Sequence, residues 1–147
     1  MITLSGVRKP CSGGAATKNL VKQIPLIANE FPEIAAVHRG TINLHLEKGL
    51  LVLTPDYRTN SIPWGDIFGE QGEVFDFLRI GLEAPEGNPA IPAWIYIAHG
   101  SAHRNTFCVH EIIAPFVNLN GQAKCRIHIS RRCIELPYHQ APVVVVV

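Results

Sequence analysis

The stretch Thr41-Ile42-Asn43-Leu44-His45-Leu46-Glu47 carries the clearest structural pattern in this sequence of 147 residues. Apolar and polar residues alternate along it, and successive side chains of a β-strand point to opposite faces. The pattern therefore predicts a strand that directs Ile42, Leu44 and Leu46 into a core. Its threonine and asparagine should face a cleft on the other side.

Similar apolar alternation occurs elsewhere in the chain, between clusters of Gly, Pro and Asn. It predicts strands over residues 74–83, 93–98, 106–113 and 124–135, and a hairpin or bend at Gly49 that leads into residues 50–53. Five or six short strands are typical of a mainly β domain, either a barrel or a sandwich. One helical segment is predicted over residues 15–31, where Pro25 indicates a kink or a shorter helix that begins near the proline.

Length and composition indicate one globular domain over residues 1–147, because 47% of the residues are hydrophobic and 17% are charged. The formal net charge of +1 supplies no field that attracts polyanions, so nucleic acid is not an expected partner. The longest apolar run, residues 143–147, is far shorter than a membrane helix, and no export signal is visible. We therefore expect a cytoplasmic protein with no membrane contact, in which the four cysteines, lacking C-x-x-C spacing, are reduced.

Two oxygen-bearing side chains, those of Thr41 and Asn43, should share one face of the predicted strand. Hydroxyl and amide oxygens are hard ligands of the kind that Mg²⁺ accepts together with water and substrate phosphates. A nucleotide-bound Mg²⁺ is one interpretation. An ordinary solvated strand face is the other.

A loop of small residues precedes the helical segment and contains Ser12, Gly13 and Gly14, with Lys18 shortly after it. Backbone N–H groups in such a loop, a helix N-terminus and a nearby lysine can hold nucleotide phosphates. The loop does not match the Walker sequence, and a simple strand-to-helix turn is the alternative.

Glu111 stands among hydrophobic residues in the run Val109-His110-Glu111-Ile112-Ile113. A partly desolvated carboxylate there could accept hydrogen bonds from ligand hydroxyls or act as a general base. The alternative is a glutamate that faces water at a strand end.

Three stretches taken together resemble motifs of the archaeal CTP-dependent riboflavin kinases. They are the small-residue loop at residues 11–18, the segment His38-Arg39-Gly40-Thr41-Ile42-Asn43-Leu44 and the later run Glu111-Ile112-Ile113-Ala114-Pro115. The resemblance runs in order over about residues 2–129. It implies a small closed six-stranded barrel of the cradle-loop type with one short helical segment.

The resemblance also implies roles for individual residues. Thr41 and Asn43 would coordinate Mg²⁺, and the loop of Ser12, Gly13 and Gly14, with Lys18, would bind the nucleotide. Thr106 and Glu111 would contact the flavin or its ribityl chain, with Glu111 orienting the acceptor hydroxyl. The implied activity is phosphoryl transfer from a CTP-like nucleotide to riboflavin or a similar hydroxyl compound.

The sequence also departs from the family pattern. Arg39 replaces the expected proline, two adjacent glycines replace an alternating series, and residues 116–124 replace the leucine-arginine and aspartate-glycine-aspartate elements. A diverged barrel that binds another small molecule, or catalyses nothing, is therefore the main alternative.

Two further hypotheses use other residues. A zinc site could be drawn from His99, His103, Cys108 and His110, although no recognised ligand spacing is present. An interaction module, or a homo-oligomer, could instead pair strands through the valine run at residues 143–147.

Overall fold

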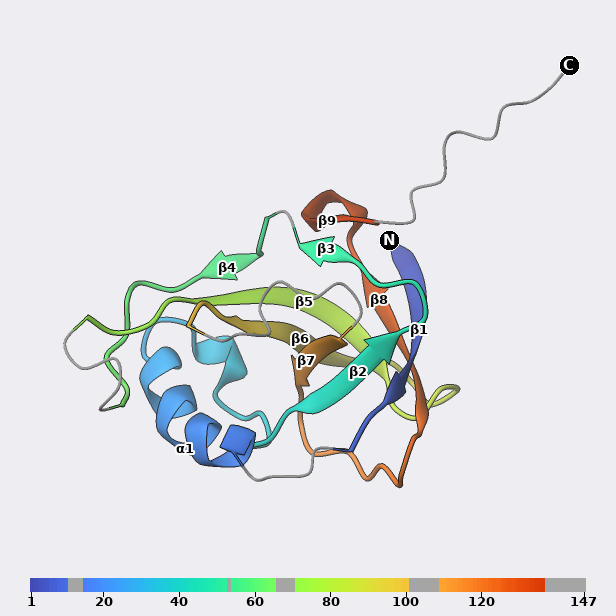
Figure 1. The fold of residues 1–147 in the computed structure, drawn as a ribbon, viewed down its shortest axis with the longest axis horizontal. Helices are drawn as coiled ribbons and strands as arrows, with labels where there is room; N and C mark the ends of the chain where they lie inside the picture. The colour runs from blue at the N-terminus through green and yellow to red at the C-terminus, as the bar shows by residue number, and fades with distance from the viewer. Residues whose placement is uncertain (11–14, 53, 66–70, 101–108, 137–147) are drawn as a thin grey trace, which may run out of the picture.

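Six antiparallel strands close into a barrel in the computed structural model, which describes residues 1–10, 15–52, 54–65, 71–100 and 109–136 (Figure 1). The barrel strands are β1 (Ile2–Arg8), β2 (Ile42–Leu46), β5 (Phe75–Glu83), β6 (Ile91–Ala98), β7 (Val109–Ile113) and β8 (Lys124–Ile129). Their order is β5-β6-β7-β2-β1-β8, and pairing between β5 and β8 closes the ring. This is the mainly β, closed six-stranded fold with one short helix that the sequence predicted.

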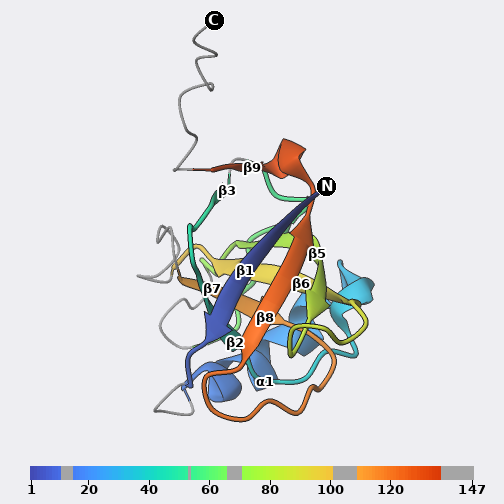
Figure 2. The same ribbon diagram turned by 90° about the vertical axis from the view of Figure 1, so that its right-hand side faces the viewer.

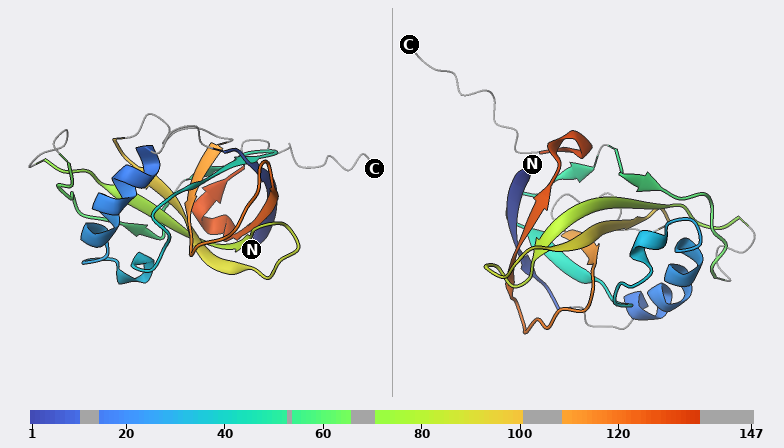
Figure 3. Two further views of the ribbon diagram at one scale, coloured as in Figure 1. Left: turned by 90° about the horizontal axis from the view of Figure 1, so that it is seen from below. Right: turned by 180° about the vertical axis from the view of Figure 1, so that it is seen from behind.

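The smaller elements lie outside the ring. They are α1 (Ala15–Ile27), two 3-10 helices over Pro32–Ile34 and Arg131–Cys133, and the short strands β3 (Leu51–Val52), β4 (Tyr57–Arg58) and β9 (Ile134–Glu135). β4 pairs with β5 at its start, while β3 and β9 form a separate two-stranded sheet. Figure 3 shows the barrel seen from below, with α1 beside it.

Other predicted boundaries can be compared with the structure. The chain bends at Gly49, where φ is 70°, as one of the two alternatives expected, and β3 then pairs with β9 rather than folding back on β2 as a hairpin. The predicted strand over residues 124–135 is divided into β8 and β9 by the 3-10 helix between them, because the chain must leave the barrel wall to reach β3. β7 begins at Val109, and residues 106–108 of the predicted strand lie outside the described residues.

The helix runs through Pro25, so the alternative of a shorter helix beginning near that residue is wrong. Its packing explains why the proline is tolerated. Leu20, Ile24 and Ile27 are buried, whereas Pro25 lies on the exposed face. Burial of the apolar stripe therefore holds the helix despite the backbone hydrogen bond that proline cannot donate.

Two hydrophobic clusters lie on opposite faces of the same sheet. The inner cluster fills the barrel and includes Leu44, Leu78, Ile95 and Ile112, all fully buried. The outer cluster lies between α1 and the outside of the barrel and contains Phe31, Phe75, Phe77, Trp94 and Tyr96. Alternation along each strand sends neighbouring residues to different clusters.

The alternation predicted for β2 matches this arrangement. Leu44 and Leu46 are buried, and Ile42 is partly buried against the same inner cluster. Asn43 and His45 are half-buried and belong to the other face. In the part of the chain that the structure describes, no helix is long and apolar enough to cross a membrane.

Candidate functional site

Three polar side chains line up across neighbouring strands on the outer face of the barrel. Asn43 on β2 is the register partner of Glu111 on β7, and Glu111 is in turn the partner of Tyr96 on β6. Side chains of directly opposed residues have their Cβ atoms about 4.5–5.5 Å apart. The fold therefore places an amide, a carboxylate and a phenol in one row, although they are far apart in sequence.

Thr41 lies beside Asn43 at the start of this row. The Thr41 hydroxyl donates to the Asn43 side-chain oxygen Oδ1 across 3.4 Å, and both residues are half-buried. A typical hydroxyl hydrogen bond is about 2.7–2.8 Å long, so this one is weak and either oxygen can turn to another partner at little cost. The two oxygens predicted to bind metal are thus adjacent and weakly engaged.

Their spacing suits two neighbouring positions around Mg²⁺. Octahedral Mg²⁺ with bonds of about 2.0–2.1 Å places adjacent ligand oxygens about 2.9 Å apart. The Thr41 and Asn43 oxygens need only a small approach from 3.4 Å to meet that geometry. Both are neutral, so the remaining positions would be left for water and for the anionic oxygens of a phosphate.

Glu111 is half-buried, and it lies between Asn43 and Tyr96 in the row. The next two residues, Ile112 and Ile113, are fully buried on the two faces of β7. The Glu111 carboxylate can accept hydrogen bonds from a ligand hydroxyl bound beside Asn43.

Tyr96 and Gln23 form a buried pair next to Glu111. The Tyr96 hydroxyl donates to the Gln23 oxygen Oε1 at 2.5 Å, and both residues are buried. Burial, together with the negative charges of Glu111 and Glu73, raises the pKa of Tyr96 far above its usual range. The phenol therefore remains protonated, and its hydrogen bond to Gln23 connects α1 to the row.

The sequence analysis did not identify Gln23 or Tyr96. A signal was present, because Leu20, Gln23, Ile24 and Ile27 follow the spacing of a buried helix face and Gln23 is the polar member. A polar residue on such a face needs a buried partner. The identity of that partner depends on tertiary structure.

The remaining predicted site residues cannot be compared with this geometry. Ser12, Gly13, Gly14 and Thr106 lie outside the described residues, and Lys18 belongs to α1 but its side chain is not described. Lys9, just after β1, lies beside the row, because its backbone N–H donates to the Asn43 carbonyl at 2.8 Å.

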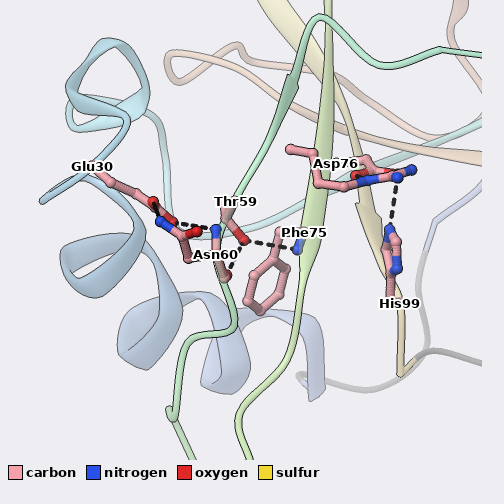
Figure 4. A network of polar contacts seen from close by, with 7 residues as sticks. Glu30, Thr59, Asn60, Phe75, Asp76 and His99 are labelled. Atoms are coloured by element: carbon pink, nitrogen blue, oxygen red, sulfur yellow. Dashed lines mark hydrogen bonds and ion pairs between the residues drawn. The ribbon is translucent and has the colours of Figure 1, made fainter.

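A second polar network lies at the beginning of β5 (Figure 4). Asp76 is buried and accepts two hydrogen bonds from Arg58, at 2.7 and 3.0 Å, and its Oδ2 lies 2.8 Å from His99 Nε2. Burial raises the pKa of this carboxyl, but the hydrogen bonds from Arg58 and His99 outweigh burial, and the net pKa is lowered. Asp76 therefore remains ionised and anchors both neighbours.

This network bears on the zinc hypothesis. His99 is engaged with Asp76, while His103 and Cys108 lie outside the described residues. Within the described ranges, no group of three or more His, Cys, Asp or Glu side chains is arranged to hold a metal ion. Of the cysteines, Cys125 and Cys133 are free and buried, and Cys11 and Cys108 fall outside the described part.

Comparison with known proteins adds no family assignment. No protein-family model matches this chain, and no curated protein matches it. A barrel fold by itself does not indicate an activity, so a function must be argued from the site.

Proposed function

We propose that this protein is a riboflavin kinase-like phosphotransferase, which transfers a phosphoryl group from a CTP-like nucleotide to riboflavin or a similar hydroxyl compound. The observation that supports the proposal most is that Asn43 lies directly opposite Glu111, with the Thr41 hydroxyl beside the Asn43 side-chain oxygen. These are the three described residues to which the family resemblance gives roles in metal binding and in orienting the acceptor.

Thr41 and Asn43 would hold the Mg²⁺ of a metal–nucleotide complex. Their oxygens are adjacent, neutral and hard, as a cation shared with phosphate oxygens requires. When bound, the metal supplies charge neutralisation at the transferring phosphoryl group.

Glu111 would receive the acceptor. The hydroxyl to be phosphorylated must lie near the terminal phosphate, and Glu111 is the cross-strand neighbour of Asn43, which would bind the metal on that phosphate. A carboxylate in this position can accept the hydroxyl hydrogen bond, orient the oxygen for attack and take its proton. The Tyr96–Gln23 pair keeps the neighbouring strand and α1 fixed around it.

Two features favour an alternative in which the barrel binds a small molecule without transferring phosphate. Arg39 folds back on its own segment and donates to the carbonyls of Ala35 and Val37, at 3.2 and 2.8 Å. Phe116, the first residue of the segment 116–124 that stands in place of the two expected elements, is 70% exposed and packs edge-on against His38. The segment before Thr41 and the segment after Pro115 therefore both differ from the family pattern.

The test is phosphoryl transfer by the Glu111→Gln variant. Purified protein is incubated with riboflavin, Mg²⁺ and CTP, and the phosphorylated flavin is quantified by chromatography. We expect the variant to lose on the order of 10²–10⁴-fold in rate, as general-base removal usually does, while Mg²⁺-dependent CTP binding measured by calorimetry persists. Glu47→Gln, at an exposed glutamate just after β2, is the matched control and should retain the activity.

Asn43→Ala completes the experiment. It removes one hard oxygen without altering the apolar face of β2, so Mg²⁺-dependent nucleotide binding should weaken. Wild-type protein that phosphorylates riboflavin from none of the four ribonucleoside triphosphates contradicts the kinase proposal. If that protein still binds a nucleotide or flavin, the non-catalytic alternative holds instead.

A further inference from the structure

A hydroxyl, an imidazole and a carboxylate lie in line on the wall of the barrel that faces away from the row described above. Thr3 Oγ1 on β1 is 2.9 Å from His128 Nδ1 on β8, and His128 Nε2 is 2.5 Å from Glu83 Oε2 on β5. Two strands separate β8 from β7 in either direction around the ring, so this line is remote from Glu111. Figure 2 shows β1 and β8 side by side on this wall.

The carboxylate determines which imidazole nitrogen carries the proton. The hydrogen bond from His128 and the backbone N–H of Gly87 lower the pKa of Glu83, so Glu83 is ionised and can only accept. The Nε2 atom must then be the donor to Glu83, and in the neutral ring Nδ1 is left as an acceptor. The Thr3 hydroxyl therefore donates its proton toward Nδ1, as a nucleophile does toward its general base.

Neighbouring residues hold this arrangement in place. Thr3 and His128 are register partners, and Gly81 is the partner of His128 on its other side. A Cβ atom at Gly81 would lie 3.6 Å from the His128 Cβ and 3.7 Å from its Cδ2, which is ordinary van der Waals contact, so the ring lies directly beside this glycine. The Arg126 guanidinium, 3.6 Å from Glu83 Oε1, holds the carboxylate from the other side and also pairs with Glu86.

Exposure increases along the line from the carboxylate to the hydroxyl. The Glu83 side chain is 12% exposed and that of His128 is 27% exposed, while Thr3 is an exposed residue. The orienting group is thus shielded, and the nucleophilic oxygen is open to a reagent. This distribution suits reaction with a molecule that approaches the outside of the barrel.

We propose that Thr3 is a nucleophile activated by His128 and Glu83, and that it accepts acyl groups from activated esters. The Thr3 oxygen forms a bond to the acyl carbon while its proton passes to His128 Nδ1, and the bond between that carbon and the leaving group breaks. The proton then leaves with the departing group or to water, and no oxidant or reductant is needed.

The groups in the line limit the class of acyl donor. Thr3 supplies the nucleophile, His128 the base and Glu83 the orienting carboxylate, and these roles include no donor to an oxyanion at the acyl carbon. The acyl carbon must therefore be activated by its own leaving group, as in aryl esters, thioesters and acyl phosphates. Ordinary amides and alkyl esters are not expected to react.

The experiment uses p-nitrophenyl acetate and the full chain. Acetylation is followed by mass spectrometry on the tryptic peptide that ends at Arg8, which contains Thr3, Ser5 and the terminal amine of Met1. Ser5 is an internal control, because it is a hydroxyl on the same strand and face whose register partner is Arg126 rather than a histidine. We expect Thr3 to react on the order of 100-fold faster than Ser5, the usual contribution of a general base.

Variants separate activation from simple accessibility. His128→Gln should reduce acetylation of Thr3 on the order of 100-fold, the usual contribution of a general base, and Glu83→Gln should reduce it in part. His45→Gln, at a half-buried histidine on β2, should leave it unchanged. Equal reaction of Thr3 and Ser5 in the wild type, or acetylation of Thr3 that survives His128→Gln, would overturn the proposal.

A measurement on unaltered protein covers the case in which a variant does not fold. The ratio of Thr3 to Ser5 acetylation in the wild type needs no substitution, because both hydroxyls lie in the same tryptic peptide.

Discussion

The two faces of the sheet formed by β5, β6 and β7 are filled by different kinds of side chain. The buried residues of the inner cluster that the structure describes are Leu, Ile, Ala and Cys, whereas the outer cluster beneath α1 holds the buried aromatic rings. The interior of an eight-stranded barrel is just wide enough for side chains to fill, and a ring of six strands is narrower. Branched aliphatic residues fit such a lumen, and the larger rings pack outside it.

The outer cluster also differs in how it is held together. Tyr96 donates to Gln23, the Trp94 indole donates to Glu33 at 2.7 Å, and the Trp64 indole donates to Glu73 at 2.8 Å. Each aromatic residue thus combines apolar burial with a directional bond. Packing of the inner cluster depends on how well side-chain volumes fill the lumen, whereas packing of the outer cluster depends on both volume and hydrogen bonds. The row of Asn43, Glu111 and Tyr96 adjoins the outer cluster through Tyr96.

Truncation of adjacent residues on β5 should give the largest effects. Phe77 and Leu78 are both fully buried but belong to the outer and inner clusters. Phe77→Ala should lower the free energy of unfolding by about 3–5 kcal/mol and Leu78→Ala by about 2–5 kcal/mol, measured by urea denaturation. The comparison predicts that Phe77→Ala also loosens α1, visible as faster amide exchange in the helix. Equal helix protection in both variants would show that the two clusters are not separate.

Removal of one hydroxyl should have an intermediate effect. Tyr96→Phe keeps the ring but leaves the Gln23 oxygen buried without its donor, and such a group costs about 1–3 kcal/mol. Ile95→Val, at the neighbouring residue that faces the lumen, removes only a methylene and should cost about 0.5–1.5 kcal/mol. Thermal and urea unfolding of both variants measure the difference. A Tyr96→Phe protein as stable as wild type would mean that directional bonds do not matter on the outer face.

The last prediction concerns the pH dependence of stability at Asp76, a buried residue that alternation places on the same face of β5 as Leu78. Its folded pKa is below the value of about 3.9 for an unperturbed aspartate, so its hydrogen bonds with Arg58 and His99 stabilise the fold above that pH and are lost as pH falls through the lowered pKa. Asp76→Asn should therefore flatten the acid limb of a stability profile measured between about pH 5 and 2. An unchanged limb would show that other carboxyl groups dominate acid unfolding.

Local pattern was enough to predict the faces of β2, because alternation is a property of one strand and Leu44 and Leu46 are buried as expected. The class of the fold followed from several such strands together with the resemblance. Three features could not be predicted from local pattern: the pairing of β3 with β9, the division of the predicted strand after Lys124, and the buried Gln23–Tyr96 pair. Each depends on contacts between segments far apart in sequence, for which a single sequence carries no direct signal.

The pairing of β1 with β8 has a consequence for how this chain folds. Thr3 and His128 are 125 residues apart and must meet before the ring can close. The chain therefore loses the conformational entropy of this long loop before the contacts between β1 and β8 can stabilise it. Proteins dominated by such pairings fold in milliseconds to seconds rather than microseconds. Until β8 arrives, β1 and β5 each keep an unpaired edge, so the open barrel is the species most exposed to strand exchange with another copy.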